Sequence, residues 1–314
     1  MSVLVGRLSR LTVGCAAAAV LLGAGEAGAQ QRRRSNRIDQ THIDTTVAIG
    51  RNGTVSVSAT SGDVVVVGWS KDGVHIRAES DGGNIRMDAS NGSRVSVDVG
   101  GGDSHVEVSV PYGVHVVASS HSGDVSVGGT RGAVDARTQS GDLHVEDVVG
   151  KLSANTFSGD ITANSINGDA TVQTISGSVR LTDERGDVEI GTVSGEIELR
   201  GMTSKTVRAK TTSGDVTYDG LIDSQGRYEM STHSGDLRLH VQRDAGAQIS
   251  VSTWSGEIDS AFPMTLNPGE HGIGSQKAKR FTFSIGSGAA RITADTFSGD
   301  ISISSNGRGA NLRR

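Results

Sequence analysis

A short motif, Ser-Gly-Asp or a close variant, returns at a fixed interval through the middle of this chain. Five successive copies begin 18 residues apart, and the spacing loosens in later copies. The copies begin at Ser61, Ser122, Ser140, Ser158, Ser176, Ser194, Ser213, Ser234, Ser255 and Ser298. A period this short is typical of stacked units, because one unit of that length cannot bury its own apolar face. The motif therefore indicates a repeat architecture.

Apolar and polar residues alternate directly after each copy, as in Val125–Val127 and Leu143–Val145. A period of two in runs rich in β-branched residues predicts strands. A second glycine marker, also followed by alternating residues, stands nine residues after the motif glycine, at Gly132, Gly150, Gly168 and Gly186. Glycine permits backbone conformations closed to other residues, and Ser and Asp hydrogen-bond neighbouring amides. Each unit is thus predicted to hold two strands and two turns, with Ser-Gly-Asp as a corner.

Two topologies could use such units, namely an up-and-down array of antiparallel hairpins or a solenoid of parallel strands. We favour the solenoid, because it places identical positions on top of one another about 4.8 Å apart. Threonines two residues before the serine fit such a ladder, at Thr138, Thr156, Thr174 and Thr192. The fold class expected is all-β, a single-chain parallel β-solenoid of 18–21-residue coils with less regular β caps at both ends.

The chain divides into six predicted segments. These are a signal peptide (1–29), a basic linker (30–40), an N-terminal β region or cap (41–121), the regular solenoid (122–261), a C-terminal β region or cap (262–305) and a flexible tail (306–314). Arg7 and Arg10 precede an apolar stretch that ends at Ala27-Gly28-Ala29, as in a cleaved secretory signal. Export to the periplasm, cell surface or medium is expected, with no transmembrane anchor after cleavage.

Composition excludes several kinds of site. The one cysteine, Cys15, lies in the leader, so disulfides and cysteine chemistry are excluded from the mature chain. Lys and Arg total 30 against 35 Asp and Glu, and removal of the leader leaves 28 against 34. A mildly acidic chain gives no indication of nucleic-acid binding.

Several motifs together are similar to those of a bacterial family of secreted β-strand-repeat proteins known as putative adhesins, a domain of unknown function. They are Ser61-Gly62-Asp63-Val64 with Gly68-Trp69, Val108-Ser109-Val110-Pro111, the Thr-x-Ser-Gly-Asp units, Phe262-Pro263, Gly286-Ser287-Gly288-Ala289 and Thr296-Phe297-Ser298-Gly299-Asp300. The resemblance covers about residues 40 to 305. It implies an exported β-solenoid, and it supplies no ligand or catalytic residue that could be transferred to this chain.

Aspartates of successive motifs would lie along one edge of the stack, at Asp124, Asp142 and Asp160. Such a row needs solvent, hydrogen bonds or a cation to offset its repulsion, and calcium suits oxygen ligands. Ser178 and Glu196 interrupt the row, and the sequence lacks the denser glycine pattern of calcium-binding rolls. We therefore favour turn capping over calcium binding for these side chains.

The residue directly before each motif serine varies, and in three adjacent coils it is Phe157, Ile175 and Val193. If these side chains point outward, they form an apolar stripe that a partner could contact. If they point inward, they complete the core, and we expect this second arrangement.

The function expected is that of an exported, non-enzymatic protein, an adhesin or cell-envelope scaffold that binds a surface glycan or protein through many weak contacts. One alternative is an envelope protein that binds or cleaves polysaccharide, although this chemistry uses paired carboxylates among aromatic platforms and aromatic residues are few here. Another alternative is a periplasmic component of a stress or signalling system. No catalytic residue and no resident cofactor is assigned.

Overall fold

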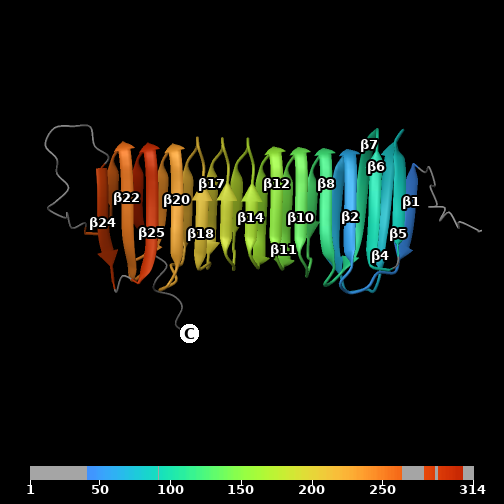
Figure 1. Cartoon of the computed structure of the whole chain (residues 1–314), viewed down its shortest axis with the longest axis horizontal. Helices are drawn as coiled ribbons and strands as arrows, with labels where there is room; N and C mark the ends of the chain where they lie inside the picture. The colour runs from blue at the N-terminus through green and yellow to red at the C-terminus, as the bar shows by residue number, and fades with distance from the viewer. Residues whose placement is uncertain (1–40, 91, 264–278, 287–288, 307–314) are drawn as a thin grey trace, which may run out of the picture. The chain divides into compact units, whose positions relative to one another are not determined.

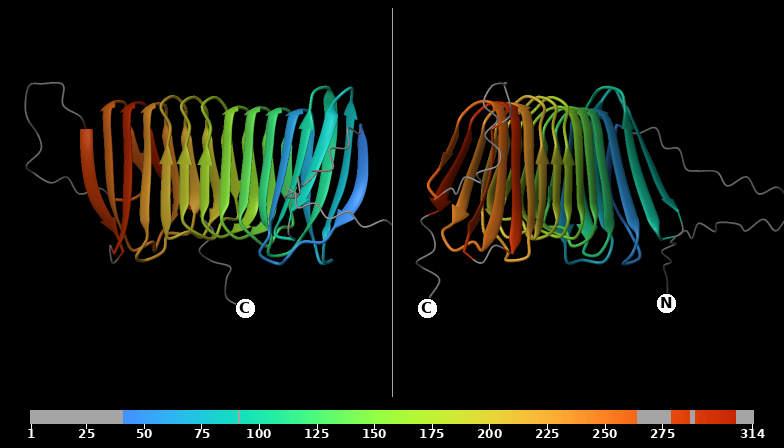
Figure 2. Two further views of the ribbon diagram at one scale, coloured as in Figure 1. Left: turned by 45° about the vertical axis from the view of Figure 1, so that its right-hand side comes forward. Right: turned by 60° about the vertical axis from the view of Figure 1, so that its left-hand side comes forward.

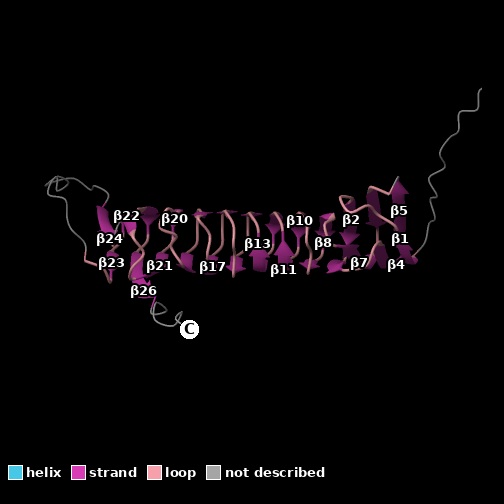
Figure 3. Ribbon diagram, turned by 90° about the horizontal axis from the view of Figure 1, so that it is seen from below, coloured by secondary structure: helices cyan, strands magenta, loops and turns pink. Residues whose placement is uncertain are grey.

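The computed structural model describes residues 41–90, 92–263, 279–286 and 289–306, which all belong to one compact unit. Within these ranges every regular element is a β-strand (Figures 1 and 3). No helix there has the length and apolar character that crossing a membrane would need. The signal peptide, the basic linker and the tail from residue 307 onward lie outside the described residues.

The strands form two sheets of 13, which we call sheet A and sheet B. Sheet A runs in the order β24 (Lys279–Ile285), β22 (Ala247–Ser255), β25 (Ala290–Ser298), β20 (Arg227–Ser234), β18 (Thr206–Lys210), β16 (Val188–Gly191), β14 (Ala170–Gln173), β12 (Leu152–Ser158), β10 (Val134–Ser140), β8 (His115–Ser122), β2 (Thr54–Ser61), β6 (Arg94–Gly100) and β5 (Asn84–Ser90). Sheet B runs in the order β1 (His42–Val47), β4 (Val74–Asp81), β7 (Asp103–Pro111), β3 (Asp63–Trp69), β9 (Val125–Gly128), β11 (Leu143–Val149), β13 (Ile161–Asn167), β15 (Val179–Thr182), β17 (Ile197–Met202), β19 (Val216–Gly220), β21 (Leu237–Gln242), β26 (Ile301–Asn306) and β23 (Ile258–Ser260).

Successive coils stack in parallel and in register. Val134 pairs with Leu152, and Thr138 with Thr156, so each residue lies beside its equivalent in the next 18-residue unit. Each coil gives one strand to sheet A, turns at Ser-Gly-Asp, gives one strand to sheet B and returns at the second glycine corner (Figure 2). The parallel β-solenoid predicted from the repeat is therefore confirmed, and the antiparallel hairpin array is not formed.

The core is a continuous set of aliphatic ladders between the two sheets. Inward positions of neighbouring strands, such as Leu143 and Ile161 in sheet B, are completely or almost completely buried. Side chains alternate between the two faces of a strand, so one set of positions fills the space between the sheets and the other faces outward. Two buried tyrosines, Tyr218 and Tyr228, meet edge to face in the core near its C-terminal end.

Glycine is required at the corners because successive coils approach each other closely there. Gly141 has φ +150°, and a Cβ on it would lie 2.3 Å from the carbonyl oxygen of Gly123 in the preceding coil. The second corner behaves in the same way at Gly168, which has φ +156° and lies against Gly150. The sequence spacing of these glycines therefore reflects both a backbone conformation and a contact between coils.

One coil at each end stacks out of sequence order. Strands β25 and β26 lie between the coil β20–β21 and the coil β22–β23, which precede them both in the chain (Figure 1). At the other end, the coil β2–β3 lies between β6–β7 and β8–β9. Beyond these coils the pairing becomes antiparallel, through β24 on β22 and through β5, β4 and β1. The irregular segments expected at both ends thus include two regular coils with their own Ser-Gly-Asp corner.

Candidate functional site

The Ser-Gly-Asp corner carries a ladder of carboxylates bound to backbone amides. The amide of Asp142 donates to Oδ1 of Asp124 at 2.8 Å, and the amide of Asp160 donates to Oδ1 of Asp142 at 2.8 Å. Asp160 in turn accepts the amide of Ser178 at 2.7 Å. These three carboxylates therefore cap the turn of the following coil, which is the role favoured from the sequence.

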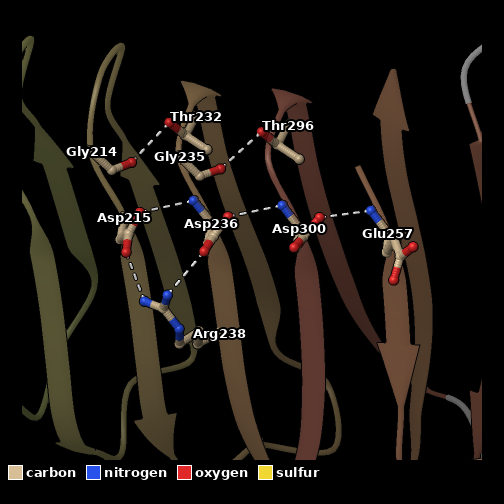
Figure 4. A network of polar contacts seen from close by, with 9 residues as sticks. All are labelled: Gly214, Asp215, Thr232, Gly235, Asp236, Arg238, Glu257, Thr296 and Asp300. Carbon is tan, nitrogen blue, oxygen red and sulfur yellow. Dashed lines mark hydrogen bonds and ion pairs between the residues drawn. The ribbon is translucent and has the colours of Figure 1, made fainter. Parts of the chain in front are cut away.

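The ladder stops at Ser178. It resumes nearer the C-terminal end, where Figure 4 shows it. There the amide of Asp236 donates to Asp215, that of Asp300 to Asp236, and that of Glu257 to Asp300, at 2.8 to 2.9 Å. Among the described residues no group of three or more His, Cys, Asp or Glu side chains is arranged to hold a metal ion. Calcium binding by Asp124, Asp142 and Asp160 is therefore a matter for experiment.

The threonine ladder lies directly inside the corner. Thr138 donates its hydroxyl to the carbonyl of Gly123, Thr156 to Gly141, and the same bond recurs in later coils (Figure 4). Each threonine is buried, and its bond to the motif glycine of the preceding coil provides the carbonyl with a partner. The Thr-x-Ser-Gly-Asp pattern is thus explained by hydrogen bonds between coils.

The expectation that Phe157, Ile175 and Val193 complete the core is wrong. Their side chains are 57%, 45% and 48% exposed. The buried threonine before each of them explains the direction, since neighbouring residues of an extended chain point to opposite sides. These three residues therefore form an apolar row on the outside of the corner.

Three aromatic rings continue this row towards the C-terminal end. The ring of Phe297 stacks on His233 with centroids 4.8 Å apart and on Trp254 with centroids 6.0 Å apart, and both interplanar angles are 10° or less. The stack forms because β25 lies between β20 and β22. All three residues occupy the same motif position in the sequence, but their sequence order gives no indication that Phe297 lies in the middle.

We use the name corner column for the residues directly before the motif serine on seven adjacent coils. Strands of adjacent coils lie about 4.8 Å apart, so the column extends over about 29 Å. Its exposed polar member, Thr212, separates the aliphatic half from the aromatic half. The members are, in spatial order, Phe157, Ile175, Val193, Thr212, His233, Phe297 and Trp254.

Carboxylates flank the column, and some of them are paired with arginine. Burial alone would raise the pKa of Asp215, but hydrogen bonds from the Asp236 amide and the Arg238 guanidinium outweigh it and hold this pKa below its ordinary value. Arg238 also lies 3.0 Å from the carboxylate of Asp236. Asp300 and Glu257 are exposed, and neither has an ion-pair partner within the part of the chain that the structure describes.

A buried acid lies away from this surface, at the second corner. Glu184 is 0% exposed, and neither carboxylate oxygen has a hydrogen-bond partner among the described residues. It occupies the position that Val148 and Ile166 fill in the preceding coils, and burial raises its pKa to about 8. The sequence signal for it is a glutamate at a repeat position that is apolar in the two preceding coils.

Two solved structures of other proteins are similar to this chain. A putative adhesin from Bacteroides fragilis is 11% identical, with a TM-score of 0.43 over 84% of this chain and 97% of its own. A putative cell adhesion protein from Clostridium sporogenes is 7% identical, with a TM-score of 0.21 over 84% of this chain and 99% of its own. No curated protein matches the sequence. The model of the Toastrack DUF4097 family matches residues 33–181 and 104–304, and the chain belongs to this family.

Proposed function

We propose that this protein is an exported, non-enzymatic binding protein, an adhesin or cell-envelope scaffold, and that the corner column is its binding surface. The observation that carries the proposal is the concentration of exposed apolar side chains in one row. Five of the nine large apolar side chains exposed among the described residues belong to the corner column. Contiguous exposed apolar surface on a soluble protein is typical of interaction sites, whereas scattered single residues are not.

A row of similar side chains supports binding through many contacts of the same kind. Each coil adds one contact, so a long ligand that follows the stack gains affinity from several weak contacts together. The rigid ladders beneath the column hold these side chains in place before binding, which lowers the entropy cost of association. Both properties suit adhesion to, or organisation of, an extended surface.

The binding role is tested by the substitution Ile175→Asp, which places a charge in the aliphatic half of the column. Binding of the labelled, purified protein to isolated cell envelopes is measured by co-sedimentation. We expect Ile175→Asp to abolish most of the binding while the melting temperature stays near that of the wild type. Val149→Asp is the matched control, because Val149 is also an apolar residue about half exposed, 50% against 45% for Ile175, and lies outside the column.

Equal binding by the Ile175→Asp and Val149→Asp proteins would refute the proposal, since the column would then make no special contribution. A collapsed fold in Ile175→Asp alone would also contradict it, because it would show that the side chain is needed in the core.

Protease accessibility on intact cells separates an adhesin from a scaffold. Degradation on intact cells is expected for an adhesin displayed at the surface. Protection until the outer layer is permeabilised is expected for a periplasmic scaffold, and it would also suit a component of a stress or signalling system.

The polysaccharide alternative is tested by incubating the protein with envelope polysaccharides and measuring new reducing ends. Turnover would replace the proposed function with an enzymatic one. The carboxylates of the ladder favour the non-enzymatic proposal, since their Oδ1 atoms accept backbone amides instead of facing an open cleft.

A further inference from the structure

The aromatic half of the corner column is an exposed stack of three rings. Phe297 lies between His233 and Trp254, with centroids 4.8 Å and 6.0 Å away and interplanar angles of 10° and 5°. The Phe297 ring therefore has an aromatic neighbour on each side. Aromatic side chains are enriched in interfaces between proteins, where they bury large apolar area. An exposed stack of this kind therefore suits contact with a protein.

A row of negative charge runs beside these rings. Each ring stands three residues before a carboxylate of the ladder, so Phe297 is accompanied by Asp300 and Trp254 by Glu257. The inner oxygen of Asp300 accepts the amide of Glu257 at 2.8 Å, while both side chains are exposed and lack an ion-pair partner among the described residues. The ammonium of Lys279 donates to the carbonyl of Gly256 at 2.8 Å, and no ion pair joins Lys279 to Glu257.

An arginine lies near the aliphatic half of the column. Arg180 pairs with Glu198, and its pKa is raised by that hydrogen bond first, by the charge of Glu198 next, and further by Glu196 and Asp160. Asp160, three residues after Phe157, and Glu196, three residues after Val193, therefore lie close enough to Arg180 to act on its pKa. At the aromatic end, exposed carboxylates accompany a stack of rings.

We propose that the aromatic end of the corner column, Phe297 and Trp254 with Asp300 and Glu257, binds a protein segment that carries arginine or lysine together with apolar side chains. This inference rests on the proposed function of the column as a binding surface. The apolar side chains pack against the exposed rings, and the cations pair with the carboxylates of Asp300 and Glu257. Nucleic acids and acidic lipids carry the same sign of charge as this row and are repelled by it.

The experiment measures binding of short fluorescent peptides to the purified protein by anisotropy. The first peptide contains arginine and leucine, the second has glutamate in place of arginine, and the third has serine in place of leucine. The oligosaccharide cellohexaose is added as a competitor. We expect the arginine–leucine peptide to bind most tightly, the other two peptides to bind at least about tenfold more weakly, and cellohexaose not to compete.

The charge requirement is tested by the double substitution Asp300→Asn with Glu257→Gln. Asparagine keeps the oxygen that accepts the Glu257 amide, so the ladder stays intact while two charges are removed. We expect about tenfold weaker binding of the arginine–leucine peptide, because each exposed ion pair contributes only a few-fold. The matched control is Asp124→Asn with Asp142→Asn, which removes two ladder charges away from the rings, and it is expected to bind like the wild type.

The contribution of the rings is tested by Phe297→Ser. This substitution is expected to weaken binding of the arginine–leucine peptide more than binding of the arginine–serine peptide. Equal losses in the two double variants would overturn the inference, because the charge effect would then be general. Binding of cellohexaose in competition with the peptide would overturn it as well. If no peptide binds while Ile175→Asp still abolishes envelope binding, this inference falls and the proposed function stands; if Ile175→Asp has no effect either, both fall.

Discussion

Ser298 is the register partner of Ser234, although the coil that contains Ser255 separates the two in the sequence. Because residues 30–314 contain no cysteine, this order can be tested by cross-linking. We expect the double substitution Ser234→Cys with Ser298→Cys to form a disulfide, since adjacent strands bring the two Cα atoms within the usual range. Ser234→Cys with Ser255→Cys is the control, because two coils place these atoms about 10 Å apart. Thiol titration after mild oxidation shows which of the two variants forms a disulfide. A cross-link only in the control pair would show that the coils stack in sequence order.

Substitution of Gly141 by alanine should destabilise the protein severely. The new Cβ would lie 2.3 Å from the carbonyl oxygen of Gly123, at a φ of +150° that side chains rarely adopt. We expect a loss of at least about 2 kcal/mol in the free energy of unfolding, measured with urea. Gly191→Ala is the matched control, since open space surrounds that position, and it should change the value by less than about 0.5 kcal/mol. Similar losses in both variants would contradict the account of the corner.

Asp142→Ala and Asp142→Asn should differ in stability. Alanine leaves the amide of Asp160 without its acceptor at 2.8 Å, whereas asparagine keeps an oxygen at that position. We expect about 1 kcal/mol of destabilisation for alanine and markedly less for asparagine. Thermal unfolding followed by circular dichroism provides the measurement. Equal destabilisation by both would indicate that the charge, and not the hydrogen bond, is what the corner needs.

Chelation should leave the protein unchanged if the carboxylate ladder caps turns without a metal. Asp124, Asp142 and Asp160 each direct one oxygen to a backbone amide of the next coil. We expect the same melting temperature in EDTA and in millimolar calcium. A higher melting temperature in calcium that is reversed by EDTA would assign the row to calcium after all.

Stability should fall as the pH rises, because of Glu184. Its folded pKa of about 8 lies above the value near 4.3 of an unfolded glutamate, so the folded state holds its proton more tightly. The associated stability is complete below pH 4.3 and is lost progressively until about pH 8, with a total of up to about 5 kcal/mol. Glu184→Gln should flatten this dependence in urea titrations between pH 5 and 8. An unchanged slope would show that Glu184 does not titrate in this window.

The middle of the fold was predictable because its signals are local. The motif fixes a corner, as at Gly141, and alternation fixes which residues of each strand are buried, as for Leu143 and Val145. The place of the last coil was not predictable in the same way. Its motif at Ser298 fits the edge of any other coil equally well, so the order of stacking depends on how the connecting segments run.

The direction of the corner column could have been read from the sequence. A threonine ladder inside the corner requires the next residue to point outward, so burial of Thr156 already implies exposure of Phe157. The aromatic stack was beyond sequence reasoning, because it brings Phe297 between residues of two earlier coils. Glu184 shows a different limit of sequence reasoning. An acid at one apolar repeat position does not indicate whether the backbone bulges to expose the side chain or keeps its course and buries it.

The bond between the Asp142 amide and Asp124 is repeated between Asp160 and Asp142 with the same length. A coil in this part of the stack therefore makes the same corner hydrogen bond with the coil before it and with the coil after it. Duplication or loss of one 18-residue unit in the gene would change the length of the stack by about 4.8 Å. The new junction would use the same contacts between coils as the existing ones. The reach of such a protein can thus evolve by whole steps of recombination while the chemistry of its corners is conserved.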